Sequence, residues 1–281
     1  MKRLLPVVGV TAILSLCATE KTPGTLFVQD ASKSSQAKES PDSGSKPVTA
    51  ADSKKTADPA KKTVRKRPVN PALQPIQDVP GLPRVLLIGD SISIGYTVPV
   101  RKLLAGEMNV HRPLTNCGPT RNGVLELDRW LHDKRMGKGK WNVIHFNFGL
   151  HDLKYMGPNG ENLYSPEKGN QQVPLKEYER NLNYIVKELK KTGARLIWRN
   201  TTPVPPGAKG RVVGDAARYN AVARKVMNRH DIRIHDMYKQ VKPNMDTLMR
   251  KANVHFTPAG SQKLAELVVR EIRRAVEDRE S

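Results

Sequence analysis

The sequence has little of what stabilises small secreted scaffolds or binds nucleotides. It contains two cysteines, Cys17 and Cys117, in 281 residues, which excludes a disulfide scaffold and a zinc cluster built on cysteine. Aromatic residues make up 5% of the chain and do not interleave with basic residues, as they do in many nucleic-acid-binding domains. P-loop, G-x-G-x-x-G and EF-hand patterns are absent from the sequence. We therefore expect no cofactor, no metal and no nucleic-acid partner.

Acidic residues are scarce relative to basic ones. The chain has 48 Lys+Arg against 27 Asp+Glu, a formal net charge of +21, and most of the excess lies after residue 83, in the part predicted to fold. Many of these cations lie on predicted helices, as in residues 187–191, where a solvated face is the simplest explanation. An anionic envelope polymer remains a candidate partner on grounds of charge.

The chain opens with a short apolar run after two basic residues. The run from Leu4 to Leu16 has the length of a signal-peptide core and is too short to span a bilayer as a mature helix. It predicts a signal peptide over residues 1–18 and an exported protein that is periplasmic, envelope-tethered or extracellular. Cys17 is similarly placed to the lipidated cysteine of bacterial lipoproteins, although Leu16 is larger than the residue usual before it. A lipid at Cys17 would be the membrane attachment; an uncleaved apolar anchor is the alternative.

Residues 19–83 are rich in Lys, Ser, Ala, Pro, Asp and Thr and show no sustained helical or strand period. Such a segment cannot bury enough apolar surface to offset the entropy of ordering it. We therefore predict a disordered linker over 19–83, followed by a folded domain over 84–281.

From residue 84 onward, apolar runs typical of buried strands alternate with stretches of helical period. Strands are expected near residues 84–88, 109–112, 141–148, 195–198 and 232–234, and helices follow each of them. This alternation predicts an α/β fold with three layers and a mostly parallel sheet of about five strands. Ligands of such sheets bind beyond the carboxyl ends of the strands.

Gly89-Asp90-Ser91 follows the first predicted strand and opens the first helix. A serine there presents its hydroxyl at the sheet edge, and the helix N-terminus favours a developing oxyanion. A serine that only caps the helix is the alternative. With the later motifs, this one resembles the nucleophile motif of the SGNH (GDSL-type) hydrolases, in particular a secreted bacterial subgroup. The resemblance implies a flavodoxin-like α/β/α fold, with Ser91 as nucleophile and its N–H in the oxyanion hole.

Two further blocks of that family have counterparts after the second and third strands. The resemblance implies an oxyanion-hole glycine, for which Gly118 is the first candidate and Gly123 the second. The family's G-x-N-D block corresponds to Gly149-Leu150-His151-Asp152, so His151 stands where the family has asparagine. An imidazole N–H can donate the same hydrogen bond; Asn147 is the alternative donor, and Asp152 is expected to orient the loop.

The fourth block contains the general base. His255 matches the histidine of the family's D-x-x-H motif, but Ala252 occupies the aspartate position. An amide oxygen can orient a catalytic imidazole, so Asn253 is the expected partner and Asp246 a less favoured carboxylate. Because a neutral partner stabilises the imidazolium less, a slow enzyme or a serine–histidine dyad is expected.

Two other kinds of site are alternatives to an SGNH-type serine site. The α/β-hydrolase fold carries its serine in G-x-S-x-G, and the residue two after Ser91 is Ser93 instead of glycine. A metal site formed by His145, His151 and Asp152 is the other alternative. His145 and His151 lie too far apart along an extended chain to share a metal ion easily.

These features predict an exported serine esterase that hydrolyses acyl esters, with acetyl groups on carbohydrate as the preferred substrate. A lipase or thioesterase is one alternative. The other is an envelope-anchored carbohydrate- or wall-binding protein that keeps the fold with weak or no turnover.

Overall fold

A computed structural model describes residues 69–160 and 162–277. The predicted signal peptide, Cys17 and most of the predicted linker lie outside these residues. A five-stranded parallel sheet of order β2-β1-β3-β6-β7 forms the centre of the described part. The expected α/β class and sheet are therefore confirmed.

The strands are short. They are β1 (Arg84–Ile88), β2 (Asn109–His111), β3 (Val143–Phe146), β6 (Arg195–Arg199) and β7 (Arg233–His235). Of these, β1, β3 and β6 consist mainly of apolar residues. All residues of β1 and β3 are buried, because helices cover both faces of a parallel sheet. Each strand lies within about two residues of its predicted position, the usual uncertainty of element ends.

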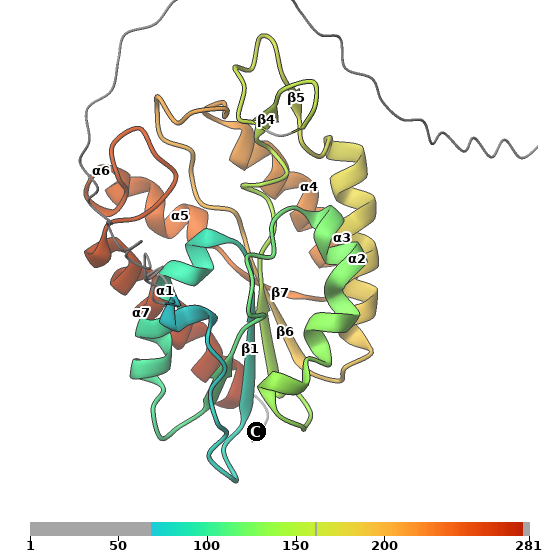
Figure 1. The fold of residues 1–281 in the computed structure, drawn as a ribbon, viewed down its shortest axis with the longest axis vertical. Coiled ribbons are helices and arrows are strands. Elements are labelled where there is room, and N and C mark those ends of the chain that lie inside the picture. Colours follow the sequence, from blue (N-terminus) through green and yellow to red (C-terminus); the bar gives the residue numbers. More distant parts are fainter. Residues whose placement is uncertain (1–68, 161, 278–281) are drawn as a thin grey trace, which may run out of the picture. The chain divides into compact units, whose positions relative to one another are not determined.

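Helices cover the sheet on both sides (Figure 1). On one side, α1 (Ser91–Leu103) packs against α7 (Pro258–Glu277). On the other, α3 (Leu175–Lys190) lies between α2 (Thr120–Leu131) and α4 (Asp215–Arg229). The apolar positions of α3 recur at helical spacing, and Tyr178, Leu182, Ile185, Val186 and Leu189 are all buried. This single amphipathic stripe explains why the helix lies flat against its neighbours.

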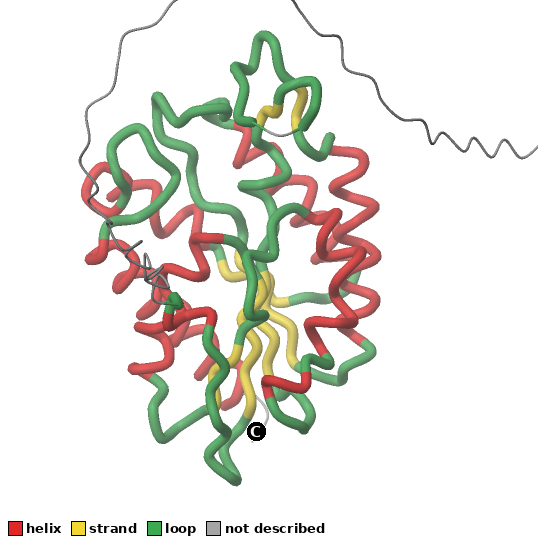
Figure 2. Tube along the Cα trace, in the orientation of Figure 1, coloured by secondary structure: helices red, strands yellow, loops and turns green. Residues whose placement is uncertain are grey.

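The carboxyl ends of the strands lead into the longest loops, which gather at one end of the sheet (Figure 2). The small antiparallel pair β4 (Tyr155–Met156) and β5 (Asn170–Gln171) lies in the loop after β3. The short helices α5 (Met237–Val241) and α6 (Met245–Leu248) follow β7. Within the described residues, no helix is both long and apolar enough to cross a membrane.

The packed part of the chain begins before Arg84, the predicted start of the domain. A short 3-10 helix, Pro71–Leu73, packs near α1. Asp78 accepts hydrogen bonds from Arg84 Nε, at 2.8 Å, and from His111 Nε2, at 2.5 Å. These polar contacts attach the segment to β1 and β2. Residues 69–83 contain four prolines and no sustained helical or strand period, which explains why hydrophobic patterning did not detect them.

Candidate active site

Ser91 is the first residue of α1, directly after the loop that ends β1. Helix formation starts there because Asp90 caps it: Asp90 Oδ1 accepts a hydrogen bond from Ile92 N at 2.9 Å. The first N–H groups of a helix have no partner within it. The nucleophile candidate is thus held at a helix end whose free donors favour negative charge.

Ser91, His255 and Asn253 form one chain of hydrogen bonds. Ser91 Oγ lies 2.9 Å from His255 Nε2, and His255 Nδ1 lies 2.7 Å from Asn253 Oδ1. The backbone N–H of His255 also donates to Asn253 Oδ1, at 3.0 Å. The structure thus brings together the three residues that the sequence proposed as the catalytic group.

The backbone contact determines the direction of the whole chain. A backbone N–H can only donate, so the Asn253 side-chain atom that faces it must be the amide oxygen. That oxygen in turn requires a proton on Nδ1 of His255. Nε2 then carries the lone pair and can accept the hydroxyl proton of Ser91, as a general base must.

Asn253 and His255 sit on a tight loop between α6 and α7. The loop is closed by the pair Met249 and Phe256 and by Arg250 N, which donates to His255 O at 2.9 Å. Asp246, the alternative orienting group, lies on α6 with an exposed side chain. The contact to His255 Nδ1 is made by Asn253 instead.

The loop after β2 supplies the glycine candidate. Gly118 has φ +63°, a conformation that favours glycine, and its N–H donates to Asn116 Oδ1 at 3.0 Å. Gly123, the second candidate, lies within α2. A Cβ at Gly123 would lie 2.6 Å from Ile185 and 2.9 Å from Phe148, so this glycine permits close helix packing and is not an oxyanion donor.

Arg112, which no sequence motif marks as part of the site, connects the loop after β1 with the loop after β2. Its side chain is fully buried, and one terminal nitrogen donates to Gly89 O at 3.1 Å and to Thr115 O at 3.0 Å. The other donates to Ser93 Oγ at 3.0 Å and to Thr97 Oγ1 at 3.3 Å. The only sequence signal for it was its place directly after a strand.

Three of the expected residues follow β3: Asn147, His151 and Asp152. Each has a different role. Asp152 is buried, and its Oδ1 accepts hydrogen bonds from Thr120 N, at 2.8 Å, and Thr120 Oγ1, at 2.5 Å. It therefore anchors the loop to the start of α2. His151 is partly exposed beside this anchor, and the charges of Asp90 and His255 both act on it. His151 is thus close enough to Asp90 and His255 for their charges to shift its pKa.

Asn147 does not face the site, contrary to its expected role as an alternative oxyanion donor. Its side chain is buried; Nδ2 donates to Arg199 O at 2.8 Å, and Oδ1 accepts from Arg199 at 2.6 Å. Asn147 sits at the end of a fully buried strand, where burial forces its amide to find partners inside the protein.

Burial and nearby cations keep both imidazoles of the site neutral. Burial lowers the pKa of His255, and the guanidinium groups of Arg211 and Arg250 lower it further against the opposing charge of Asp90. Burial likewise lowers the pKa of His151, with Lys154, Arg211 and His255 adding to the effect and Asp90 opposing it. A neutral His255 can act as a base, and a neutral His151 retains one N–H donor.

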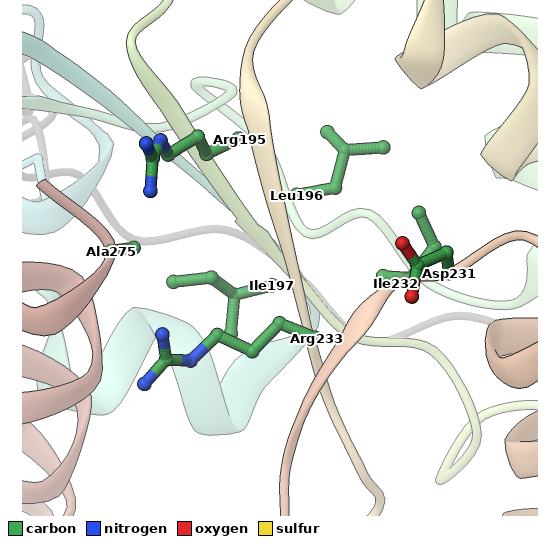
Figure 3. Close-up of a pocket in the computed structure, with 7 residues that line it drawn as sticks. All are labelled: Arg195, Leu196, Ile197, Asp231, Ile232, Arg233 and Ala275. Carbon is green, nitrogen blue, oxygen red and sulfur yellow. The ribbon is translucent and has the colours of Figure 1, made fainter. Parts of the chain in front are cut away.

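A depression of about 280 Å³ opens beside the hydrogen-bonded pair. Its lining consists of Ser91, Ile92, Ile94, Gly95, Arg250, His255, Phe256 and Ser261. A separate depression lies where β6 and β7 begin, at the opposite end of the strands (Figure 3). There the side chains of Arg195 and Arg233 point towards Ala275 of α7, and the lining contains the carboxylate of Asp231 but no serine, cysteine or histidine.

Residues 69–160 and 162–277 contain no group of three or more histidines, cysteines or carboxylates arranged to hold a metal ion. His145, one of the metal-site candidates, is buried in β3 with its Nε2 3.2 Å from His235 Nδ1. Cys117 is buried, and burial raises the pKa of its thiol to about 11. Neither residue forms a second centre next to Ser91.

Comparison with known proteins assigns the family. Residues 87–263 match the model of the GDSL-like lipase/acylhydrolase family. A crystal structure of a lipase/acylhydrolase from Enterococcus faecalis shares 20% identity, covers 68% of this chain and 95% of that one, and superposes with a TM-score of 0.54. An acetylxylan esterase from Geobacillus stearothermophilus shares 17% identity over 68% and 94% of the two chains, with a TM-score of 0.52.

No curated protein matches the chain. The family match spans more than half of its length and contains Ser91, His255 and the four loops described above. The chain therefore belongs to the GDSL-like lipase/acylhydrolase family and is an enzyme that hydrolyses ester bonds.

Proposed function

We propose that the protein is an exported serine esterase that removes small acyl groups, acetyl above all, from carbohydrate. Ser91 is the nucleophile, His255 the general base and Asn253 the residue that positions His255. The single observation that carries the mechanism is the unbroken hydrogen-bond chain from Ser91 Oγ through His255 to Asn253 Oδ1.

In the first half of the reaction, Ser91 Oγ attacks the acyl carbonyl while His255 Nε2 takes the hydroxyl proton. The tetrahedral intermediate collapses when His255 gives that proton to the leaving alcohol, and an acyl group remains on Ser91. Water activated by the same imidazole then attacks the acyl carbon and releases the acid. His255 passes the proton taken from that water to Ser91 Oγ, which restores the free enzyme, and no cofactor enters the cycle.

The oxyanion is stabilised by the Ser91 N–H, the Gly118 N–H and the His151 ring. The helix N-terminus at Ser91 supplies the first donor. Gly118 N–H donates to Asn116 Oδ1 in the free enzyme, so the Asn116 side chain has to release it when substrate binds. Removal of one oxyanion-hole donor typically lowers the rate about 10²–10³-fold.

Three observations support the substrate class. The depression beside Ser91 has a volume of about 280 Å³, which suits a short acyl group. Structural neighbours include acetylxylan esterases. The apolar leader and the basic composition of the sequence suit a protein that works on polymers outside the cytoplasm, where an anionic envelope polymer is a further proposed partner. A lipid on Cys17 would tether it there.

Hydrolysis of 4-nitrophenyl acetate by the full-length chain tests the mechanism. Ser91→Ala should reduce kcat by at least about 10³, and Ser91 should be the residue modified by a fluorophosphonate probe. Ser165→Ala, which removes an exposed hydroxyl in the loop after β3, is the matched control and should retain full rate. Labelling at another residue, or full activity in Ser91→Ala, would refute the assignment.

A carbohydrate-binding protein with weak turnover is the second candidate, because the orienting residue is a neutral amide. The same assay separates the two functions. A folded chain that binds acetylated oligosaccharide but hydrolyses no short-chain ester would favour the binding function.

A further inference from the structure

Arg250 is a cation in the wall of the proposed active site. Its side chain lines the depression that contains Ser91 and His255. Arg250 Nε donates to Phe256 O at 3.2 Å, which fixes the plane of the guanidinium against the loop. The two terminal nitrogens extend beyond this anchor, and the residue is exposed. A substrate seated at Ser91 therefore meets a positioned guanidinium.

Two more cations border the same site. Arg211 Nε donates to Leu150 O, next to His151, at 3.2 Å. The positive charges of Arg211 and Lys154 both lower the pKa of His151, and Arg211 and Arg250 both lower the pKa of His255. Lys154, Arg211 and Arg250 thus form a cationic rim around the two imidazoles.

The three residues of the cationic rim lack the ion pairs that several other arginines in the described part of the chain form. Several arginines elsewhere pair with carboxylates, as in Arg121 with Glu177 and Arg273 with Glu107, whereas Arg101 donates to backbone carbonyl groups. Across residues 69–160 and 162–277, none of the three rim residues forms an ion pair. Two carboxylates act on the rim, Asp90 on Arg211 and Asp152 on Lys154, and both are buried. Positive charge that is not paired with an exposed carboxylate raises the local concentration of anionic ligands.

We propose that the cationic rim is a subsite for a carboxylate carried by the substrate, with Arg250 as its direct ligand, so that the preferred esters are acylated acidic sugars. This inference rests on the proposed esterase function and adds a specificity to it. A planar guanidinium with free terminal nitrogens matches a carboxylate in geometry as well as charge.

The subsite also complements the unusual partner of His255. The neutral amide of Asn253 supplies no negative charge when His255 becomes an imidazolium during attack. A substrate carboxylate on the rim offsets the positive charge of Arg250 and so reduces the repulsion that the imidazolium experiences. An anionic substrate is therefore expected to have a higher kcat as well as a lower KM.

A matched substrate pair provides the test. The full-length enzyme is assayed with a mono-O-acetylated methyl glucuronoside and with the same compound whose carboxylate is converted to the primary amide. Both carry one identical acetyl ester and differ in one charge. We expect kcat/KM for the acid to exceed that for the amide by at least about tenfold, the size typical of a charge-assisted hydrogen bond.

Variants assign the preference to Arg250. In Arg250→Gln the acid-to-amide ratio should fall about tenfold, while Arg250→Lys, which keeps the charge but not the planar geometry, should give an intermediate ratio. The ratio is the readout because damage to the loop would slow both substrates equally. Lys251→Gln is the control: it removes a neighbouring exposed charge outside the depression and should leave the ratio unchanged.

Equal rates for acid and amide in the native enzyme, or an unchanged ratio in Arg250→Gln, would overturn the subsite. If neither acetylated sugar is hydrolysed, ligand-observed NMR of Ser91→Ala with methyl glucuronoside and its amide decides the question instead. The rim is supported if Ser91→Ala binds the acid more tightly than the amide and the double variant Ser91→Ala/Arg250→Gln loses this preference. Equal binding of acid and amide by Ser91→Ala refutes it. Failure of the esterase proposal is recognised separately, by absent turnover of 4-nitrophenyl acetate.

Discussion

One oxygen of Asn253 accepts two hydrogen bonds from His255, one from the ring Nδ1–H at 2.7 Å and one from the backbone N–H at 3.0 Å. The pair fixes the tautomer and the ring orientation without any ionic charge. Because a carboxylate in this place would also stabilise the imidazolium electrostatically, the enzyme has the geometry of a triad with reduced electrostatic support.

Asn253→Asp should therefore increase activity. The carboxylate keeps the same acceptor geometry and adds negative charge beside Nδ1, which stabilises the imidazolium and raises the pKa of His255. We expect kcat for 4-nitrophenyl acetate to rise about tenfold and the acid limb of the pH profile to move up by about one unit. Steady-state kinetics between pH 4 and pH 9 measure both effects.

The pH dependence of the native enzyme follows from the lowered pKa of His255. His255 acts as a base only when neutral, and its lowered pKa keeps it neutral below its ordinary value of 6.5. Activity of the native enzyme should therefore persist into mildly acidic solution and be lost as pH falls through the lowered pKa. Asn253→Ala, the counterpart variant, should lose about tenfold in kcat. If both Asn253 variants behave like the native enzyme, residue 253 does not orient His255 during turnover.

His151 is expected to act only in the transition state. His151→Ala should lower kcat about 10²-fold with little change in KM, because the oxyanion donor is needed when the carbonyl becomes tetrahedral. His151→Asn, which restores the amide donor usual in the family, should retain most of the rate. His132→Ala on the exposed end of α2 serves as the control. Full kcat in His151→Ala would show that the oxyanion hole lacks this donor.

Asp152 should make stability depend on pH. Burial raises its pKa to about 7, against 3.8 for an ordinary aspartate, so between these values the native state holds a proton that the unfolded state has released. Its contribution to the free energy of unfolding therefore falls as pH rises from about 4 to about 7, by on the order of 4 kcal/mol. Asp152→Asn should remove this part of the slope.

Urea denaturation of native protein and Asp152→Asn at pH 4, 5.5, 7 and 8 provides the measurement. The difference between the two curves is the readout, because other titrating groups are common to both. Asp128→Asn, at an exposed carboxylate on α2, should run parallel to the native curve. Parallel curves for Asp152→Asn as well would mean that Asp152 ionises normally in the folded protein.

The sequence predicted the sheet, its flanking helices and the serine–histidine–asparagine group. These features are local: a buried strand such as residues 84–88 is recognised by its apolar run, and Ser91 and His255 each stand in a motif at a strand or helix boundary. The ordinary D-x-x-H motif places the partner three residues before the histidine, where this chain has Ala252. Asn253, two residues before His255, was recognised instead because its amide oxygen can accept a hydrogen bond from the ring.

What the sequence by itself determined is the order of elements and the residues that can carry the chemistry, because hydrophobic period and motif spacing are properties of neighbouring residues. Tertiary structure alone decided which side chains face the site. It turned Asn147 inward onto Arg199, used Gly123 for helix packing, buried Arg112 beneath two loops and placed Arg250 beside Ser91. Those outcomes depend on contacts between segments far apart in the chain, and burial fixes them by requiring every enclosed polar group to find a partner.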